Sequence, residues 1–162
     1  MRTILWTTIF ATALASGACN KKKQDDMGAA ASEVKKTQEG VNDQAKDLDK
    51  TLGDKKATPN ELNKAQGDLE AAKVDLNAAR EKYSITVKDR LAKLDIRLKE
   101  LAMKTDAKAT AAATTLQTRR TELATRIDGV KDHAAADWDA FTKDVDTSFD
   151  KLESDLNDSL KK

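Results

Sequence analysis

The chain has 162 residues, of which 35% are charged, 39% are hydrophobic and only 4% are aromatic. Its formal net charge of +1 at pH 7 gives no overall sign that would favour a polyanionic or polycationic partner. The single cysteine, Cys19, and the single histidine, His133, exclude a disulfide framework and a zinc site built from several Cys or His ligands. Six glycines and one proline are too few for a turn-rich β fold and are typical of long helices.

The first eighteen residues have the parts of a secretory signal. Arg2 supplies the positive charge, the apolar run 4–15 is too short to cross a bilayer as a helix, and small residues lead up to Cys19. This arrangement resembles the lipobox signal of bacterial lipoproteins, although Ser16 stands where that family usually has leucine. The resemblance implies cleavage before Cys19, acylation of that residue and anchoring of the chain in a lipid bilayer. The alternative is an ordinary signal peptide whose removal leaves a free thiol.

The residue that follows the cysteine also carries an implication. In lipoproteins of bacteria with two membranes, Asn20 in place of aspartate implies the outer membrane, with the protein facing the periplasm. A host with a single membrane would carry the same protein on the cell surface. Residues 19–31 are polar and show no periodic apolar face, so we predict a lipidated cysteine followed by a flexible tether.

Residues 32–162 show the periodicity of four helices, predicted at about 32–52, 59–104, 107–131 and 137–161. Thr58, Pro59 and Glu61 predict a capping box at the start of the second helix. Its apolar residues are spaced first by seven and then by alternating fours and threes: Leu62, Leu69, Leu76, Tyr83, Val87, Leu91, Leu94, Leu98 and Leu101. We therefore predict an all-α fold, an elongated antiparallel helical bundle with coiled-coil-like packing. A helical hairpin runs into an up-down-up three-helix bundle.

The charges of the predicted helices differ in sign. Residues 80–127 hold 12 basic and 6 acidic side chains, whereas residues 128–162 hold 5 basic and 10 acidic ones. A basic segment can indicate nucleic-acid binding. Because an acidic helix of similar length follows it in the chain, we predict pairing between the two segments and no nucleic-acid partner.

No pattern in the chain indicates catalysis or a cofactor. His133 stands alone in a predicted connection, where a solvated turn residue is expected. Four aspartates of the last helix, Asp144, Asp146, Asp150 and Asp155, lack the loop of a cation site and are predicted to form its solvated face. The aromatic residues Trp138, Phe141 and Phe149 recur at helical spacing, which predicts core positions. We expect a protein that is not an enzyme and holds no cofactor or metal.

Three functions without catalysis are compatible with these patterns. The first is a structural or protein-interaction lipoprotein of the bacterial cell envelope, anchored through Cys19 and contacting an envelope protein. The second is lipid or membrane-surface binding, because residues 32–160 resemble exchangeable apolipoproteins in their repeated amphipathic helices. The third is covalent attachment to peptidoglycan through Lys162, because the murein lipoprotein is also a lipidated helical rod that ends in lysine. This chain lacks the repetitive trimeric coiled-coil sequence of that protein.

Overall fold

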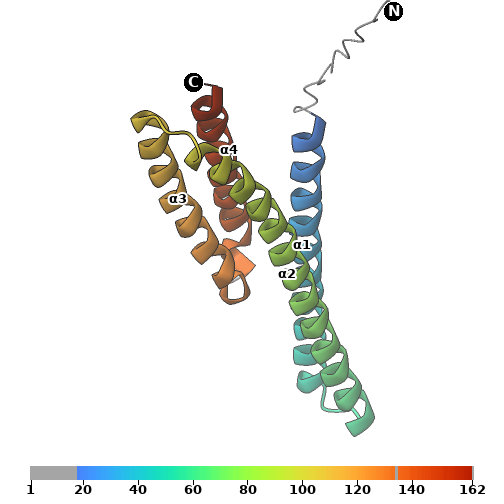
Figure 1. Ribbon diagram of the computed structural model, residues 1–162. Helices are drawn as coiled ribbons and strands as arrows, with labels where there is room; N and C mark the ends of the chain where they lie inside the picture. Colours follow the sequence, from blue (N-terminus) through green and yellow to red (C-terminus); the bar gives the residue numbers. More distant parts are fainter. Residues whose placement is uncertain (1–17, 134, 162) are drawn as a thin grey trace, which may run out of the picture.

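The computed structural model describes residues 18–133 and 135–161. They form four α-helices, α1 (Ala18–Gly53), α2 (Pro59–Ala102), α3 (Ala107–Asp128) and α4 (Trp138–Lys161), with two short 3-10 helices, η1 (Gly129–Asp132) and η2 (Ala135–Asp137), before α4 (Figure 1). The part of the chain that the structure describes contains no strand. The predicted all-α bundle is confirmed.

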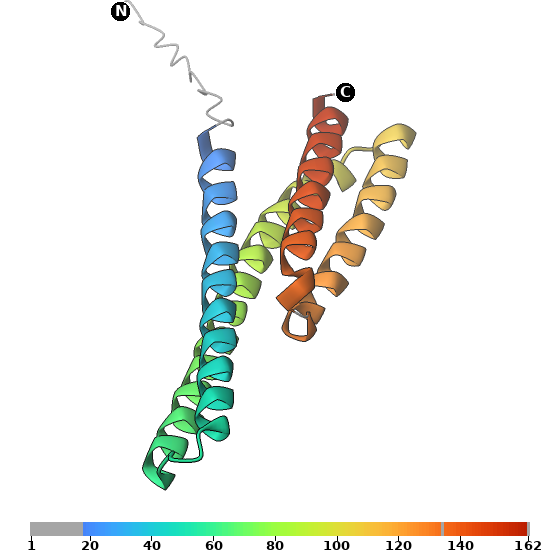
Figure 2. The same ribbon diagram turned by 180° about the vertical axis from the view of Figure 1, so that it is seen from behind.

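The helices lie side by side in an elongated, antiparallel arrangement (Figures 1 and 2). Helices α1 and α2 form a long hairpin whose turn lies at one end of the molecule. Helices α3 and α4 pack beside the C-terminal half of α2, and the end of α4 lies near the α2–α3 connection. The hairpin therefore continues into a bundle, as the spacing of the apolar residues predicted.

Helix α2 begins with the predicted capping box. The Thr58 side chain accepts a hydrogen bond of 3.3 Å from the Glu61 amide, and the Thr58 amide donates one of 2.8 Å to the Glu61 carboxylate. The Glu61 carboxylate accepts hydrogen bonds from the Thr58 amide and the Thr58 hydroxyl as an anion, which lowers the pKa of its carboxyl group. The helix has 44 residues, about 66 Å, and ends two residues before the predicted boundary. Helix α3 is capped by Asp106 and ends at Asp128, where 3-10 geometry replaces the last predicted turn.

The predicted flexible tether is wrong for the described part of residues 19–31. Helix α1 begins at Ala18, and Met27 and Ala30 are 1% and 4% exposed. Together with Val34 they follow the three-and-four spacing of a helix face, which extends the apolar stripe of the predicted first helix toward the N-terminus. This apolar face consists of a few isolated apolar side chains in a polar segment. The polar composition of the segment therefore gave no indication that it is buried. The N-terminal half of α1 is thus a fourth helix of the bundle.

The core is densest where four helices meet and thin along the far end of the hairpin. Leu62 and Leu69 of α2 are only half-buried, and Leu52 of α1 is 61% exposed. In the bundle the buried residues of α2, α3 and α4 include the following: Leu76, Tyr83, Val87, Leu91, Leu94, Leu98, Leu101, Leu116, Leu123, Ile127, Trp138, Phe141, Val145, Phe149, Leu152 and Leu156. None of the helices in the described ranges combines the length and the hydropathy of a bilayer-crossing segment.

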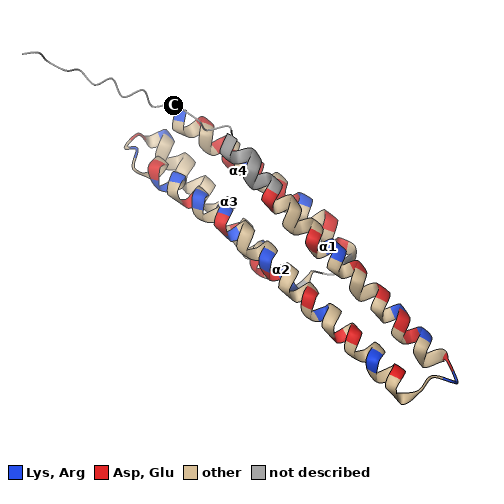
Figure 3. Ribbon diagram, turned by 90° about the vertical axis from the view of Figure 1, so that its right-hand side faces the viewer, with Lys and Arg blue, Asp and Glu red and all other residues tan. Residues whose placement is uncertain are grey.

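Charged residues of both signs are distributed along the helices (Figure 3). The predicted pairing of the basic and acidic segments is confirmed by ion pairs between α3 and α4. Arg119 lies 2.6 Å from Asp155, and Arg126 pairs with Asp144. Because these side chains are about half exposed, the ion pairs contribute little to the stability of the fold. They help to determine that α3 and α4 are neighbours.

Candidate functional site

Cys19, the predicted lipidation site, lies in the first turn of α1, and the helix continues without interruption from it into the bundle. The apolar run and Ser16 of the predicted signal lie outside the described residues, as does Lys162. Acylation of Cys19 therefore stays a prediction. The structure adds one geometric fact: Met27, the first buried side chain of α1 among the described ones, is eight residues or about 12 Å beyond Cys19.

A buried arginine lies at the centre of the bundle. The side chain of Arg90 on α2 is only 3% exposed and contacts both α1 and α4. Its Nε donates a 2.9 Å hydrogen bond to Glu153, and its Nη2 lies 3.2 Å from Asp150. Its Nη1 lies 3.5 Å from the sulfur of Met27, and the guanidinium carbon is 4.4 Å from the centre of the Phe149 ring.

The Arg90 cluster is a structural clamp between helices. A buried charge is tolerated only where it is paired and its hydrogen-bond donors are satisfied, and Glu153, whose side chain is 10% exposed, provides that partner. Asp150 is 55% exposed, so solvent weakens its share of the interaction. The geometry fixes the relative register of α2 and α4, because a slip of one turn would separate the guanidinium from Glu153.

Two polar side chains beside this cluster are imperfectly satisfied. Among the described residues, three side-chain atoms are buried without a hydrogen-bond partner: the Tyr83 hydroxyl and Asp146 Oδ1 beside this cluster, and Arg80 Nε. Burial raises the pKa of Asp146 most strongly, Arg90 opposes the shift and Asp150 adds to it. Burial also raises the pKa of Tyr83, and the Asp146 charge adds to that shift. The predicted solvated face of α4 is therefore wrong at Asp146, which the fold shelters from water.

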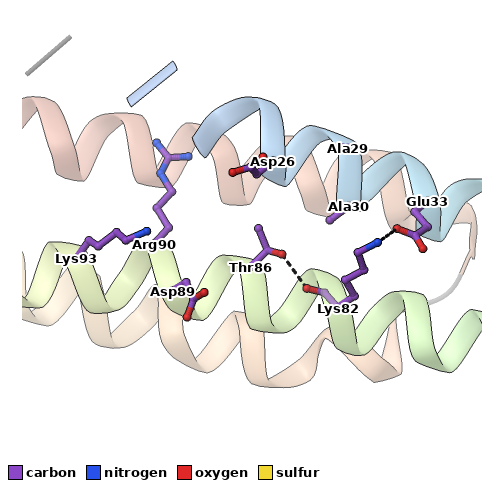
Figure 4. A pocket seen from close by; sticks show the side chains of 9 residues that line it. All are labelled: Asp26, Ala29, Ala30, Glu33, Lys82, Thr86, Asp89, Arg90 and Lys93. Atoms are coloured by element: carbon purple, nitrogen blue, oxygen red, sulfur yellow. Dashed lines mark hydrogen bonds and ion pairs between the residues drawn. The ribbon is translucent and has the colours of Figure 1, made fainter. Parts of the chain in front are cut away.

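A groove of about 370 Å³ runs between α1 and α2 next to Arg90. Figure 4 shows the nine residues that line it: Asp26, Ala29, Ala30, Glu33, Lys82, Thr86, Asp89, Arg90 and Lys93. Lys82 Nζ lies 2.5 Å from Glu33 Oε2 across the groove, and the Thr86 hydroxyl donates to the Lys82 carbonyl oxygen. Three acidic and three basic side chains balance one another, so this groove has no net charge with which to select an anion or a cation.

The other residues singled out from the sequence lie in the bundle core or on its rim. Trp138 and Phe141 are buried, and their rings lie 5.1 Å and 6.3 Å from the ring of Tyr83, which confirms their predicted core positions. His133 lies in the predicted connection. It is half-buried, with its ring 4.0 Å from Phe141, so the expectation of a solvated turn residue is wrong. Its carbonyl oxygen accepts a 2.7 Å hydrogen bond from Arg80.

Sequence reasoning missed the Arg90 cluster, although the sequence holds a signal for it. Arg90 lies three residues after Val87 and four before Leu94, so it shares the buried face of α2 with them. Glu153 lies four residues after Phe149 and shares the buried face of α4 with it. A basic and an acidic residue placed in the apolar registers of two neighbouring helices predict a buried ion pair. That signal became readable only once the pairing of α2 with α4 was known.

Among the side chains that the structure describes, those of residues 26–131, 133 and 136–161, no group of three His, Cys, Asp or Glu is arranged to hold a metal ion. The chain matches none of the protein-family models, curated proteins or solved structures with which it was compared. Function must therefore be argued from the chain's own residues.

Proposed function

We propose that this chain is a membrane-anchored helical lipoprotein that acts, without catalysis, as a structural or protein-interaction element of the bacterial cell envelope. The observation that carries the proposal is the place of Cys19: it follows a short apolar segment and small residues, and it opens a helix that enters the bundle directly. Acyl chains on Cys19 would each contribute about 0.8 kcal/mol per buried methylene to membrane binding.

The packing of the helices supports a structural role over binding of lipid by the helix faces. The apolar residues that form the core on α1 to α4 cover one another in the bundle, and the Arg90 clamp joins α2 to α4. Lipid binding in the manner of apolipoproteins would require these faces to separate and the buried Arg90–Glu153 pair to break. With α1 helical from Ala18, an anchor at Cys19 would hold the bundle close to the bilayer.

The anchoring is tested by metabolic labelling of cells with a fatty-acid analogue. The wild-type chain should carry the label and sediment with the outer membrane, and Cys19→Ser should carry none. Ser16→Leu, which restores the usual leucine of the signal, is the matched control and should be labelled at least as strongly as the wild type. Equal labelling of wild type and Cys19→Ser would overturn the proposal.

The structural role is tested separately with residues 20–162, which lack the acylated residue. This protein should not float with zwitterionic or anionic vesicles at physiological salt, and its helicity should not change when vesicles are added. Crosslinking in intact cells should join the anchored chain to an envelope protein. Saturable flotation with a rise in helicity would instead favour lipid binding.

A further inference from the structure

Helix α2 carries a second apolar stripe on the face that points away from the core. Its four large members are exposed to solvent: Val74 by 65%, Ile85 by 53%, Ile96 by 61% and Met103, directly after the helix end, by 75%. Exposed apolar residues scattered singly are ordinary, but these four share one face of α2, which is the arrangement expected of an interaction surface. We call these four residues the outer stripe.

The spacing of the outer stripe is regular. Val74, Ile85 and Ile96 recur every eleven residues, which is about 20° more than three full turns of an α-helix, and Met103 follows after seven. The exposed residues Ala78 and Ala92 lie on the same face. An eleven-residue repeat keeps its members aligned along a nearly straight helix, so the stripe is suited to another straight helix lying along α2.

Charged residues border the outer stripe on the side of α3. They are, in chain order, Glu70, Glu81, Lys88 and Lys99, and two of them mark the side by their ion pairs: Glu81 with Lys131 and Lys88 with Asp128. The order is two acidic residues followed by two basic ones. If a second α2 lies antiparallel with Ile85 facing Ile85, Glu70 faces Lys99 and Glu81 faces Lys88 of the other copy.

The border on the side of α1 has the same property. Its residues include Asp75, Lys82, Asp89 and Lys93, of which the last three line the groove beside α1 (Figure 4). In the antiparallel alignment about Ile85, Asp75 falls opposite Lys93 and Lys82 opposite Asp89 of the second copy. A two-fold axis sets each border against the same border of the partner, so both borders become complementary at once.

A parallel alignment has less complementarity. It brings the α1-side border of one copy against the α3-side border of the other, so Lys82 still lies beside Glu81 and Asp89 beside Lys88. The outer residues of the border then meet like charges, because Asp75 lies between Glu70 and Glu81, and Lys93 lies between Lys88 and Lys99. Like charges placed opposite one another disfavour that pairing. The existing ion pairs of Lys82, Lys88 and Glu81 do not prevent the antiparallel one, because they are exposed and contribute little to stability.

We propose that the outer stripe of α2 is a self-association surface, on which a second copy of this chain binds with its α2 antiparallel and Ile85 on the two-fold axis. The dimer buries the outer stripe against its own copy, with Val74 of one chain opposite Ile96 of the other. The proposal does not depend on lipidation, since every residue that carries it lies on α2.

Disulfide crosslinking tests the surface and its direction together. All variants are made in the full-length chain with Cys19→Ser, which removes the only native thiol. Ile85→Cys should form a crosslinked dimer on mild oxidation. Val74→Cys alone and Ile96→Cys alone should crosslink poorly, whereas a mixture of the two should give a heterodimer. Efficient crosslinking of Val74→Cys with itself would show a parallel arrangement and overturn the proposal.

Sedimentation of Cys-free protein supplies the matched control. Ile85→Asp should shift the chain to monomer, with at least a tenfold weaker association and unchanged helicity, because Ile85 is exposed. Leu52→Asp changes an equally exposed apolar residue away from the stripe and should leave the dimer intact. Glu81→Lys should weaken the dimer, and addition of Lys88→Glu should restore it.

The proposal would be overturned by a wild-type chain that stays monomeric at high concentration or by dimers that survive Ile85→Asp. It would also be overturned if a monomeric chain bound phosphatidylglycerol vesicles through the outer stripe.

Discussion

The indole nitrogen of Trp138 donates a 3.1 Å hydrogen bond to the carbonyl oxygen of Ala31, which lies 107 positions earlier in the chain. Trp138 is the first residue of α4 and is 3% exposed, so its N–H requires a partner inside the protein. A backbone carbonyl of α1 provides that partner. Close by, Lys35 of α1 lies 2.6 Å from Asp139 of α4. These contacts hold the N-terminal half of α1 on the bundle.

We therefore expect Met27→Ala to destabilise the protein. Met27 is 1% exposed, and truncation of a buried methionine costs about 2–5 kcal/mol because it leaves a cavity. Thermal unfolding followed by circular dichroism should show a melting temperature about 5 °C or more below that of the wild type. Lys36→Ala on the exposed face of the same helix is the control and should change the melting temperature little. Equal melting of both variants and the wild type would contradict the packing of this segment.

The sequence predicted the fold well where the apolar stripes are long. Capping residues and seven-residue spacing located α2 to within two residues, since Thr58 and Glu61 form a local motif. The start of α1 was missed because its burial depends on partners far away in the chain: Met27 is buried beside Arg90, and the Ala31 carbonyl oxygen faces Trp138. No local pattern in a polar segment with isolated apolar residues reveals such a tertiary partner.

The candidate sites divide in the same way. The signal that leads to Cys19 is local and readable from consecutive residues. The Arg90–Glu153 pair is not, because its meaning depends on which two helices are neighbours. The sequence analysis also did not identify the outer stripe of α2. Val74, Ile85 and Ile96 have helical spacing, and only their exposure in the structure shows that they do not belong to the core.

The Arg90 clamp gives a prediction about a pair of substitutions. Arg90→Met should lower the free energy of unfolding by about 3 kcal/mol or more, because it removes the cation from a buried anion. The double variant Arg90→Met with Glu153→Met should recover most of that loss, since two apolar side chains of similar length fill the same space. Urea unfolding of both single variants and the double variant measures the coupling. Additive losses would show that the two side chains do not act as a pair.

The core of the bundle predicts a strong response to a buried charge. Leu94 and Trp138 are each 3% exposed, so Leu94→Asp or Trp138→Asp should lower the melting temperature by about 5 °C or more. The exposed Lys108→Gln on α3 is the matched control and should melt with the wild type. Differential scanning calorimetry distinguishes these outcomes, and unchanged melting of both aspartate variants would refute the core assignment.

The capping box of α2 predicts a smaller effect at the hairpin turn. Thr58→Ala removes the side-chain acceptor of the Glu61 amide and should cost about 1 kcal/mol. Thr58→Ser keeps the hydroxyl group and should preserve most of the stability. Hydrogen exchange should show faster opening of the first turn of α2 in the alanine variant alone, because the core around Tyr83 lies several turns away. Equal exchange in the two variants would contradict the role of the cap.

Asp146 gives a prediction with a defined pH dependence. Burial raises the pKa of this carboxyl group in the folded protein above its ordinary value of 3.8, because the charged form is poorly solvated there; Arg90 opposes the shift and Asp150 adds to it. A raised pKa means that the folded protein binds the proton more tightly than the unfolded chain does. The contribution of Asp146 to stability is therefore largest below its ordinary pKa and is lost as the pH rises through the raised value.

Asp146→Asn removes this titration and should raise the melting temperature at pH 7. The difference between the variant and the wild type should shrink as the pH falls below the ordinary carboxyl pKa, where Asp146 is protonated in both the folded and the unfolded state. Asp144→Asn is the matched control, because Asp144 is exposed and pairs with Arg126, so its removal should stabilise nothing at pH 7. Melting curves of the three proteins between pH 3 and pH 7 measure both trends. A gain from Asp146→Asn that grew as the pH fell would reverse the sign of the linkage and contradict the burial of this carboxylate.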